Sequence, residues 1–171
     1  GALQSNTTGS PNDAFGYQAL YSNTTGNFNI AVGTSSLSAN TTGQYNAAFG
    51  YQALNQNTTG AANTAIGVYC LSFATTASGN TAVGYGSAYV ATGASNTVIG
   101  YNACNTGSNN LTTGTNNVVI GASATANAAG AVNRIVIGTG GIGQGDNYVS
   151  IGVGGTNYIY NQFNTNATWT K

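Results

Sequence analysis

The chain has 171 residues, of which 41% are hydrophobic and only 2% are charged, and its formal net charge is zero. Such a chain has no electric field with which to attract nucleic acid, an anionic membrane or a charged substrate. The hydrophobic fraction also argues against simple disorder, which requires high net charge and few apolar groups. No apolar run approaches the roughly 20 residues that span a bilayer, so we expect no membrane insertion.

A repeat of 17 residues runs through the first half of the chain. Its marker is the motif Asn-x-Ala-(Ile/Val/Phe)-Gly, which ends at Gly16, Gly33, Gly50, Gly67 and Gly84. The motif continues with looser spacing at Gly100, Gly121, Gly138 and Gly152. A second glycine precedes the first by seven residues, at Gly9, Gly26, Gly43, Gly60, Gly93, Gly114 and Gly145. An internal repeat decides the whole fold, so this periodicity takes precedence over local propensities.

Each repeat predicts one turn of a β-solenoid, or β-roll, in an all-β protein. Seventeen residues are too few for a helix pair but suit a short strand, a segment of small residues and a Thr-Thr-Gly turn. β-branched residues before the repeat glycine favour extended backbone. We expect glycine in the turns because it adopts positive φ without steric cost.

Stacked turns lie about 4.8 Å apart, so equivalent residues should form ladders along the rod. Side-chain amides should bond from turn to turn through Asn12, Asn29, Asn46, Asn63, Asn80 and Asn96. The natural core is then the apolar column Phe15, Val32, Phe49, Ile66, Val83, Ile99, Ile120, Ile137 and Ile151.

A second apolar column lies directly beside the first, through Ala14, Ala31, Ala48, Ala65, Ala82, Val98, Val119 and Val136. Neighbouring residues of a strand point to opposite faces, so both faces of the sheet are apolar. One thin solenoid buries only one of them. The other face therefore needs a partner, and we expect that partner to be another copy of the chain.

The two ends of the sequence differ from its middle. Residues 2–9 match residues 19–26 closely, so the chain begins inside a repeat and we expect a piece of a longer polypeptide or an end that stacks on a neighbour. We assign residues 1–153 to the solenoid. Residues 154–171 carry Tyr158, Ile159, Tyr160, Phe163 and Trp169, which could close the core as an atypical terminal cap.

Several repeats resemble known fibrous proteins. Asn-Thr-Ala-Ile-Gly (63–67) and Asn-Thr-Ala-Val-Gly (80–84) resemble the heads of trimeric autotransporter adhesins, whose repeats are usually shorter. Gly-Tyr-Gln-Ala-Leu (16–20) and Asn-Asn-Val-Val-Ile-Gly (116–121) are similar to tail-fibre proteins of phages, particularly those of marine cyanobacteria. Both resemblances imply an intertwined or side-by-side homotrimer with a structural or adhesive role.

The C-terminal residues also look like part of a phage fibre. Residues 154–163 and 167–171 resemble the junction that precedes an endosialidase-type intramolecular chaperone, which trimerises the fibre and then cuts itself off near a Ser-Asp pair. No such pair occurs here, so the chaperone is absent. Lys171 then lies either close to a maturation cut or at an arbitrary boundary.

The sequence predicts no enzyme and no cofactor. Catalysis needs a nucleophile with its base, paired carboxylates or a metal cluster, and the chain has no His and only Asp13 and Asp146 as acids. A ring of symmetry-related Asp13 or Asp146 around a trimer axis could hold a cation, although solvated turn residues are the simpler interpretation. Residues 138–143 match a dinucleotide fingerprint formally but lack the acidic residue about 20 positions later.

Four tyrosines follow repeat glycines and could stack on sugar rings, although regular placement favours a packing role: Tyr17, Tyr51, Tyr85 and Tyr101. Paired threonines such as Thr24 and Thr25 raise an ice-binding interpretation, but adjacent threonines point to opposite faces. Cys70 and Cys104 should be buried thiols, since two turns separate them by roughly 10 Å and a disulfide needs Cα atoms within about 7 Å.

These observations favour the structural or adhesive segment of a trimeric viral tail fibre. It would be located in the virion and would present contacts to a host-surface glycan or protein. Two alternatives remain: the head of a bacterial trimeric surface adhesin, and a subunit of a self-polymerising extracellular filament. The receptor and the binding residues are not predictable from the sequence.

Overall fold

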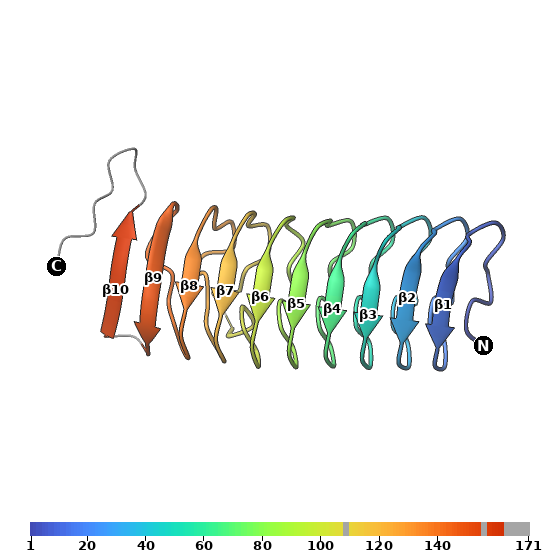
Figure 1. Cartoon of the computed structure of the whole chain (residues 1–171), viewed down its shortest axis with the longest axis horizontal. Coiled ribbons are helices and arrows are strands. Elements are labelled where there is room, and N and C mark those ends of the chain that lie inside the picture. The colour runs from blue at the N-terminus through green and yellow to red at the C-terminus, as the bar shows by residue number, and fades with distance from the viewer. Residues whose placement is uncertain (108–109, 155–156, 163–171) are drawn as a thin grey trace.

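The computed structural model describes residues 1–107, 110–154 and 157–162, and the described chain is a rod of stacked turns (Figure 1). No helix occurs among these residues, so none is long and apolar enough to cross a membrane. The strands are β1 (Asn12–Phe15), β2 (Asn29–Val32), β3 (Ala47–Phe49), β4 (Thr64–Ile66), β5 (Thr81–Val83), β6 (Thr97–Ile99), β7 (Val118–Ile120), β8 (Ile135–Ile137), β9 (Tyr148–Val153) and β10 (Asn157–Gln162).

All strands belong to one 10-stranded sheet whose spatial order is the chain order. Strands β1 to β9 are parallel and shift by one repeat, so Asn12 pairs with Asn29 and Phe15 with Val32. The longer step between Gly100 and Gly121 is absorbed outside the sheet, because Val98 still pairs with Val119. The predicted β-solenoid is therefore confirmed. We number each turn by the strand that begins it.

The last strand changes direction. β10 pairs antiparallel with β9, and Ile159 lies opposite Ile151 in that pair. The outer edge of the last parallel strand is thus already hydrogen-bonded within the chain. Of the predicted cap at 154–171, only Gly154 and the backbone of β10 are described; Phe163, Trp169 and Lys171 lie outside the described residues.

The corners of each turn use left-handed backbone at residues that are not glycine. In turn 2, Ser35, Leu37 and Tyr45 have φ of 57°, 49° and 58°. L-residues avoid this region, and bulky ones are unusual there. Hydrogen bonds between neighbouring turns hold the strained corners in place: Ser35 N–H donates to Tyr17 O at 2.8 Å and Leu37 N–H to Ala53 O at 3.0 Å.

The glycines of the Thr-Thr-Gly segment serve a different purpose from the predicted one. Gly43 does not have a positive φ; instead, a Cβ there would lie 2.4 Å from both Gly60 O and Asn40 Oδ1. The repeat glycine Gly33 combines both constraints, with φ of 128° and a Cβ position 2.6 Å from Gly50 O. Close approach of neighbouring turns, as well as φ, therefore selects glycine.

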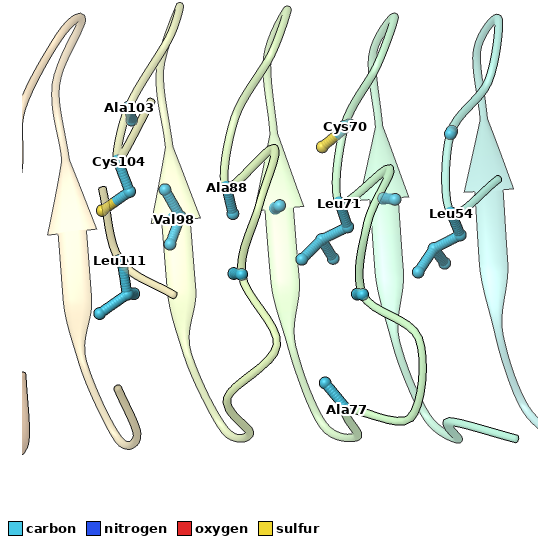
Figure 2. Packing of buried hydrophobic residues seen from close by; sticks show 14 of the residues in the cluster. Leu54, Cys70, Leu71, Ala77, Ala88, Val98, Ala103, Cys104 and Leu111 are labelled. Atoms are coloured by element: carbon cyan, nitrogen blue, oxygen red, sulfur yellow. The ribbon is translucent and has the colours of Figure 1, made fainter. Parts of the chain in front are cut away.

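The prediction of the core column was wrong, because the neighbouring column of alanines and valines lines the interior instead. Phe15, Phe49 and Ile66 point outward and are 77%, 39% and 43% exposed, whereas the alanine and valine column is buried. Opposite that column lies a set of leucines on the return path of successive turns (Figure 2). The interior between the strands and the return path is narrow. Ala or Val facing Leu fills this space, and a larger side chain would overpack it. The leucines are Leu20, Leu37, Leu54 and Leu71.

The predicted asparagine ladder is present and runs one turn further, to Asn117. We call this series the strand ladder. A typical member, Asn63, donates its side-chain amide to Asn46 Oδ1 at 3.1 Å and to Ala77 O at 2.8 Å. Its own Oδ1 accepts the backbone N–H of Asn80 at 3.0 Å. The series ends where Arg134 N–H donates to Asn117 Oδ1 at 3.0 Å.

A second ladder, not predicted from the sequence, runs through the Asn-Thr-Thr segments; we call it the return ladder. Asn40 donates to Asn23 Oδ1 at 2.8 Å and to Gly43 O at 3.0 Å. The series ends at Asn57, whose buried Oδ1 has no hydrogen-bond partner. The reason is local, because the next turn places Ala74 where a donor amide would stand. The members are Asn6, Asn23, Asn40 and Asn57.

Candidate functional site

The most prominent surface is the side of the sheet that faces away from the interior. We call it the outward face and define it as the residues one and three positions before each repeat glycine. Its large exposed members have fractional exposures between 36% and 77%: Phe15, Ile30, Phe49, Ile66, Ile99, Ile137 and Ile151. Soluble monomers rarely expose long continuous apolar surfaces, and such surfaces mark sites of association.

Strand geometry explains why this surface is continuous. Side chains alternate between the two sides of a strand. Ala65 points inward, and the next residue, Ile66, therefore points outward. In-register parallel pairing then places Ile66 beside Phe49 and Val83. Half-buried threonines occupy the outward positions of β4, β5 and β6 at Thr64, Thr81 and Thr97. The outward face is therefore an apolar column flanked by a mixed one.

The two acidic residues lie at opposite ends of the rod. Asp13 belongs to the outward face in β1, beside a hollow of about 210 Å³ that Pro11, Phe28 and Ile30 also line. No group of three or more His, Cys, Asp or Glu side chains that could hold a metal ion occurs among the described residues. The chain by itself brings Asp13 close to no second acid.

Asp146 is engaged in an ion pair. Its Oδ1 accepts hydrogen bonds from Arg134 Nε at 2.8 Å and from Val132 N–H at 2.9 Å. The Val132 N–H and the Arg134 guanidinium hold the pKa of Asp146 below its usual value. Arg134 occupies the place of the next ladder asparagine and also donates to Ala126 O. Asp146 is therefore a structural partner of Arg134 and not an open ligand for a cation.

The four candidate tyrosines are all exposed: Tyr17 by 66%, Tyr51 by 43%, Tyr85 by 47% and Tyr101 by 59%. Tyr51 and Tyr85 both contact Tyr69, which in turn contacts Tyr89, and Tyr89 contacts Phe73. The repeat pattern did not single out these three further rings, because Tyr69, Phe73 and Tyr89 occupy different positions of their repeats. Their only signal in the sequence is the concentration of aromatic residues between positions 69 and 89. A separate stacked pair, Phe28 and Tyr45, lies at the other end of the strands, with ring centroids 5.1 Å apart.

Both cysteines are buried and free, as predicted. Burial raises the pKa of Cys70 and that of Cys104 to about 12. Thiolate is the reactive form of cysteine, so neither side chain is an activated nucleophile.

The threonines and asparagines of the Asn-Thr-Thr segments make hydrogen bonds within the fold. Thr24 and Thr41 each donate their hydroxyl to the threonine carbonyl of the next turn, at 3.0 Å. In these two turns the first threonine is half-buried and the second, Thr25 or Thr42, is exposed. Asn23 begins an Asn-Thr-Thr segment that also matches a glycosylation acceptor, but its side-chain amide is buried and doubly bonded.

The glycine-rich stretch 138–143 does not form a nucleotide-binding turn. A dinucleotide fingerprint requires a helix after the glycines. Ile142 instead forms a parallel bridge with Thr125 of the preceding turn. The glycines therefore belong to the solenoid.

Comparisons with known proteins do not add a relative. No protein-family model matches the chain, and neither a curated protein nor a solved structure matches it.

Proposed function

We propose that this chain is a structural and adhesive segment of a homotrimeric viral tail fibre, in which copies pack through their outward faces. The exposed apolar column carries the proposal. Ile66, Ile99 and Ile137 are each more than a third exposed on the chain alone, and burying such side chains stabilises an assembly by about 25 cal/mol per Å² of apolar surface.

Parallel packing around a common axis suits this geometry. When identical rods align in parallel, each turn meets the equivalent turn of its partners, so the Ile and Val column faces itself along the whole rod. The mixed column brings threonine hydroxyls and the carboxylate of Asp13 to the margin. The number of three comes from the resemblance of the repeats to trimeric fibres, whereas self-association follows from the apolar surface.

In such a fibre the solenoid has a mechanical role and no catalytic one. Two ladders of amide hydrogen bonds and a sheet of parallel strands give a stiff rod. Three copies on one axis present every surface residue three times, so weak contacts to a host surface add through avidity. This location would be the virion or another extracellular surface.

The two alternatives differ in what they require of the molecule. A bacterial adhesin head would use the same outward face and differ in the segments that flank it. A self-polymerising filament would stack the β1 end of one copy on the last turn of the next. That stacking is disfavoured because β10 already pairs with β9 in the antiparallel sense. We therefore retain the adhesin head as the second candidate.

The test is the solution mass of the folded chain by light scattering, repeated after exposure to SDS without heating. We expect a trimer that resists the detergent. The double variant Ile66→Asp/Ile99→Asp should yield a folded monomer, because it places a carboxylate on two turns of the interface. Thr42→Asp, an exposed position outside the outward face, is the matched control and should remain trimeric.

A monomeric wild-type chain would contradict the proposal. So would a folded double variant that keeps the trimer. Far-ultraviolet circular dichroism separates loss of assembly from loss of fold. Very large particles would favour the filament.

A further inference from the structure

Six aromatic side chains of turns 3 to 6 form one connected group beside the repeat glycines, which we call the aromatic patch. Tyr69 is its centre, with ring centroids 5.4 Å from Tyr51, 6.2 Å from Tyr85 and 6.1 Å from Tyr89, all edge to face. Tyr89 contacts Phe73 at 4.9 Å, and Tyr85 stacks on Tyr101 at 5.5 Å. No other group of this size is recorded among the described rings.

The backbone beneath the patch is held in place by hydrogen bonds between turns. The carbonyl of Tyr51 accepts Tyr69 N–H at 2.9 Å, and the carbonyl of Tyr85 accepts Asn102 N–H at 2.8 Å. Tyr101 O accepts Ser123 N–H at 2.8 Å in the same way. The exposed rings therefore stand on a rigid base, and a ligand that binds them loses little free energy to ordering the protein.

Tyr69 differs from the residues that occupy the same corner in other turns. It has φ of 57°, and this left-handed position is filled in other turns by small or polar residues such as Gln52, Gly86 and Asn102. A bulky aromatic side chain is disfavoured there. Tyr69 contacts three other rings, so its placement assembles the patch.

The chemistry of the patch is neutral. It offers five phenolic hydroxyls on apolar rings, and the charged side chains of the described residues, Asp13, Arg134 and Asp146, all lie outside turns 3 to 6. Desolvation and the neighbouring Tyr51 hydroxyl raise the pKa of Tyr69, so that hydroxyl stays protonated at neutral pH. A charged ligand would find no counter-ion here. A sugar ring, with apolar C–H faces and many hydroxyls, matches both the aromatic rings and the phenolic hydroxyls of the patch.

We propose that the aromatic patch binds neutral glycan chains that lie along the rod. Turns repeat every 4.8 Å or so, close to the length of one sugar residue, so successive sugars meet successive turns. The patch begins after the strands have ended, and Tyr69, Phe73 and Tyr89 lie beyond the outward face. None of the six residues occupies an outward-face position, so we expect the patch to stay accessible when copies pack through that face. This inference rests on the proposed function, in which three copies multiply a weak contact.

The test is affinity electrophoresis of the intact chain in native gels that contain a neutral β-glucan, mannan or galactan, or anionic heparin. We compare the wild type with Tyr85→Ser/Tyr101→Ser. The matched control is Tyr17→Ser, which removes an even more exposed tyrosine from the same repeat position outside the patch. At least one neutral polysaccharide should retard the wild type and the control. The affinity of the double variant for that polysaccharide should be lower by about tenfold or more.

Three results would overturn the proposal: no retardation of the wild type by any neutral polysaccharide, equal retardation of the double variant, or an equal loss in Tyr17→Ser. Light scattering on the same samples separates this inference from the proposed function. A trimer without retardation contradicts only glycan binding, whereas a monomer that is still retarded contradicts only the fibre.

Discussion

The N-terminal turns and the central turns of the rod hold the same backbone together in different ways. From Asn6 to Asn57 the return path carries a ladder of amides, which is buried from Asn23 onward. From turn 4 onward the equivalent positions are Ala74, Ala91 and Leu111, all fully buried. The strand ladder continues unchanged through both regions, with Asn63 and Asn96 each donating to a backbone carbonyl at 2.8 Å.

This difference shows which polar ladder the fold requires. Each strand-ladder asparagine bonds backbone groups as well as its neighbours, and the series ends in a partner, Arg134 N–H. A return-ladder asparagine such as Asn40 also donates to a backbone carbonyl, but its Oδ1 accepts only the amide of the next asparagine, and the series ends in the unpartnered Oδ1 of Asn57. Apolar packing replaces the return ladder without changing the register of the strands, so the strand ladder is the essential one.

The largest expected effect comes from interrupting the strand ladder. Asn63→Ala leaves the buried Asn80 N–H and Ala77 O without their partners, and we expect the free energy of unfolding to fall by about 3–5 kcal/mol. Asn40→Ala should cost about 1–2 kcal/mol, because Gly43 O keeps its bond from Asn29. Urea unfolding at one fixed protein concentration measures both. Equal losses would contradict the comparison.

A smaller effect is expected from extending the return ladder by one turn. In turn 3 a Cβ at Gly60 would lie 2.4 Å from Asn57 Oδ1, so an asparagine here requires glycine three residues later. Ala74→Asn alone should therefore destabilise the chain by about 1–3 kcal/mol, since Ala77 carries a Cβ.

Ala74→Asn/Ala77→Gly removes that clash and supplies a donor to Asn57 Oδ1. We expect this double variant to be more stable than Ala74→Asn by about 1 kcal/mol or more. Ala77→Gly is the control that completes the double-mutant cycle. Additive effects in that cycle would refute the coupling between the asparagine and the glycine.

The loss of stability at low pH should include the contribution of the Arg134–Asp146 ion pair. The pKa of Asp146 is lower in the folded chain, so its stabilising contribution is present above the unfolded pKa of about 3.9 and is lost as pH falls through the folded value. Stability should be flat between about pH 5 and 8, where no side chain with an ordinary pKa titrates.

Because the Asp146 side chain is 49% exposed, solvent screening should keep the loss below about 1 kcal/mol. Asp146→Asn should flatten the acid limb in melting curves recorded from pH 2 to pH 8. A steep change of melting temperature between pH 5 and 8 would show that another group controls the assembly.

The smallest effect is expected at the thiols. With the pKa raised to about 12, Cys70 and Cys104 should resist maleimide at pH 7 in the folded chain and react in urea. Cys70→Ala should change stability by less than about 1 kcal/mol, because Ala19 and Ala53 fill the same position in other turns. Rapid labelling of the folded chain would mean that these turns open.

Much of the architecture was predictable because stacking identical turns transmits the sequence period directly into space. Asn29 and Asn46 recur at the period that in-register pairing requires, so their ladder follows from spacing alone. The return ladder was missed because Asn-Thr-Thr also suits an exposed turn, and only burial of Asn40 distinguishes the two. The aromatic patch was missed because Tyr69 and Tyr89 differ in repeat position.

The sequence by itself determined the all-β class, the period, the parallel register and the existence of two apolar faces, because all of these depend on spacing along the chain. Only the tertiary structure decided which face is the interior. Alternation states that Ala65 and Ile66 point apart, but the choice between them depends on the width left by Leu54 and Leu71 on the return path. The larger side chains remain outside, and their exposure is the observation that supports the proposed self-association.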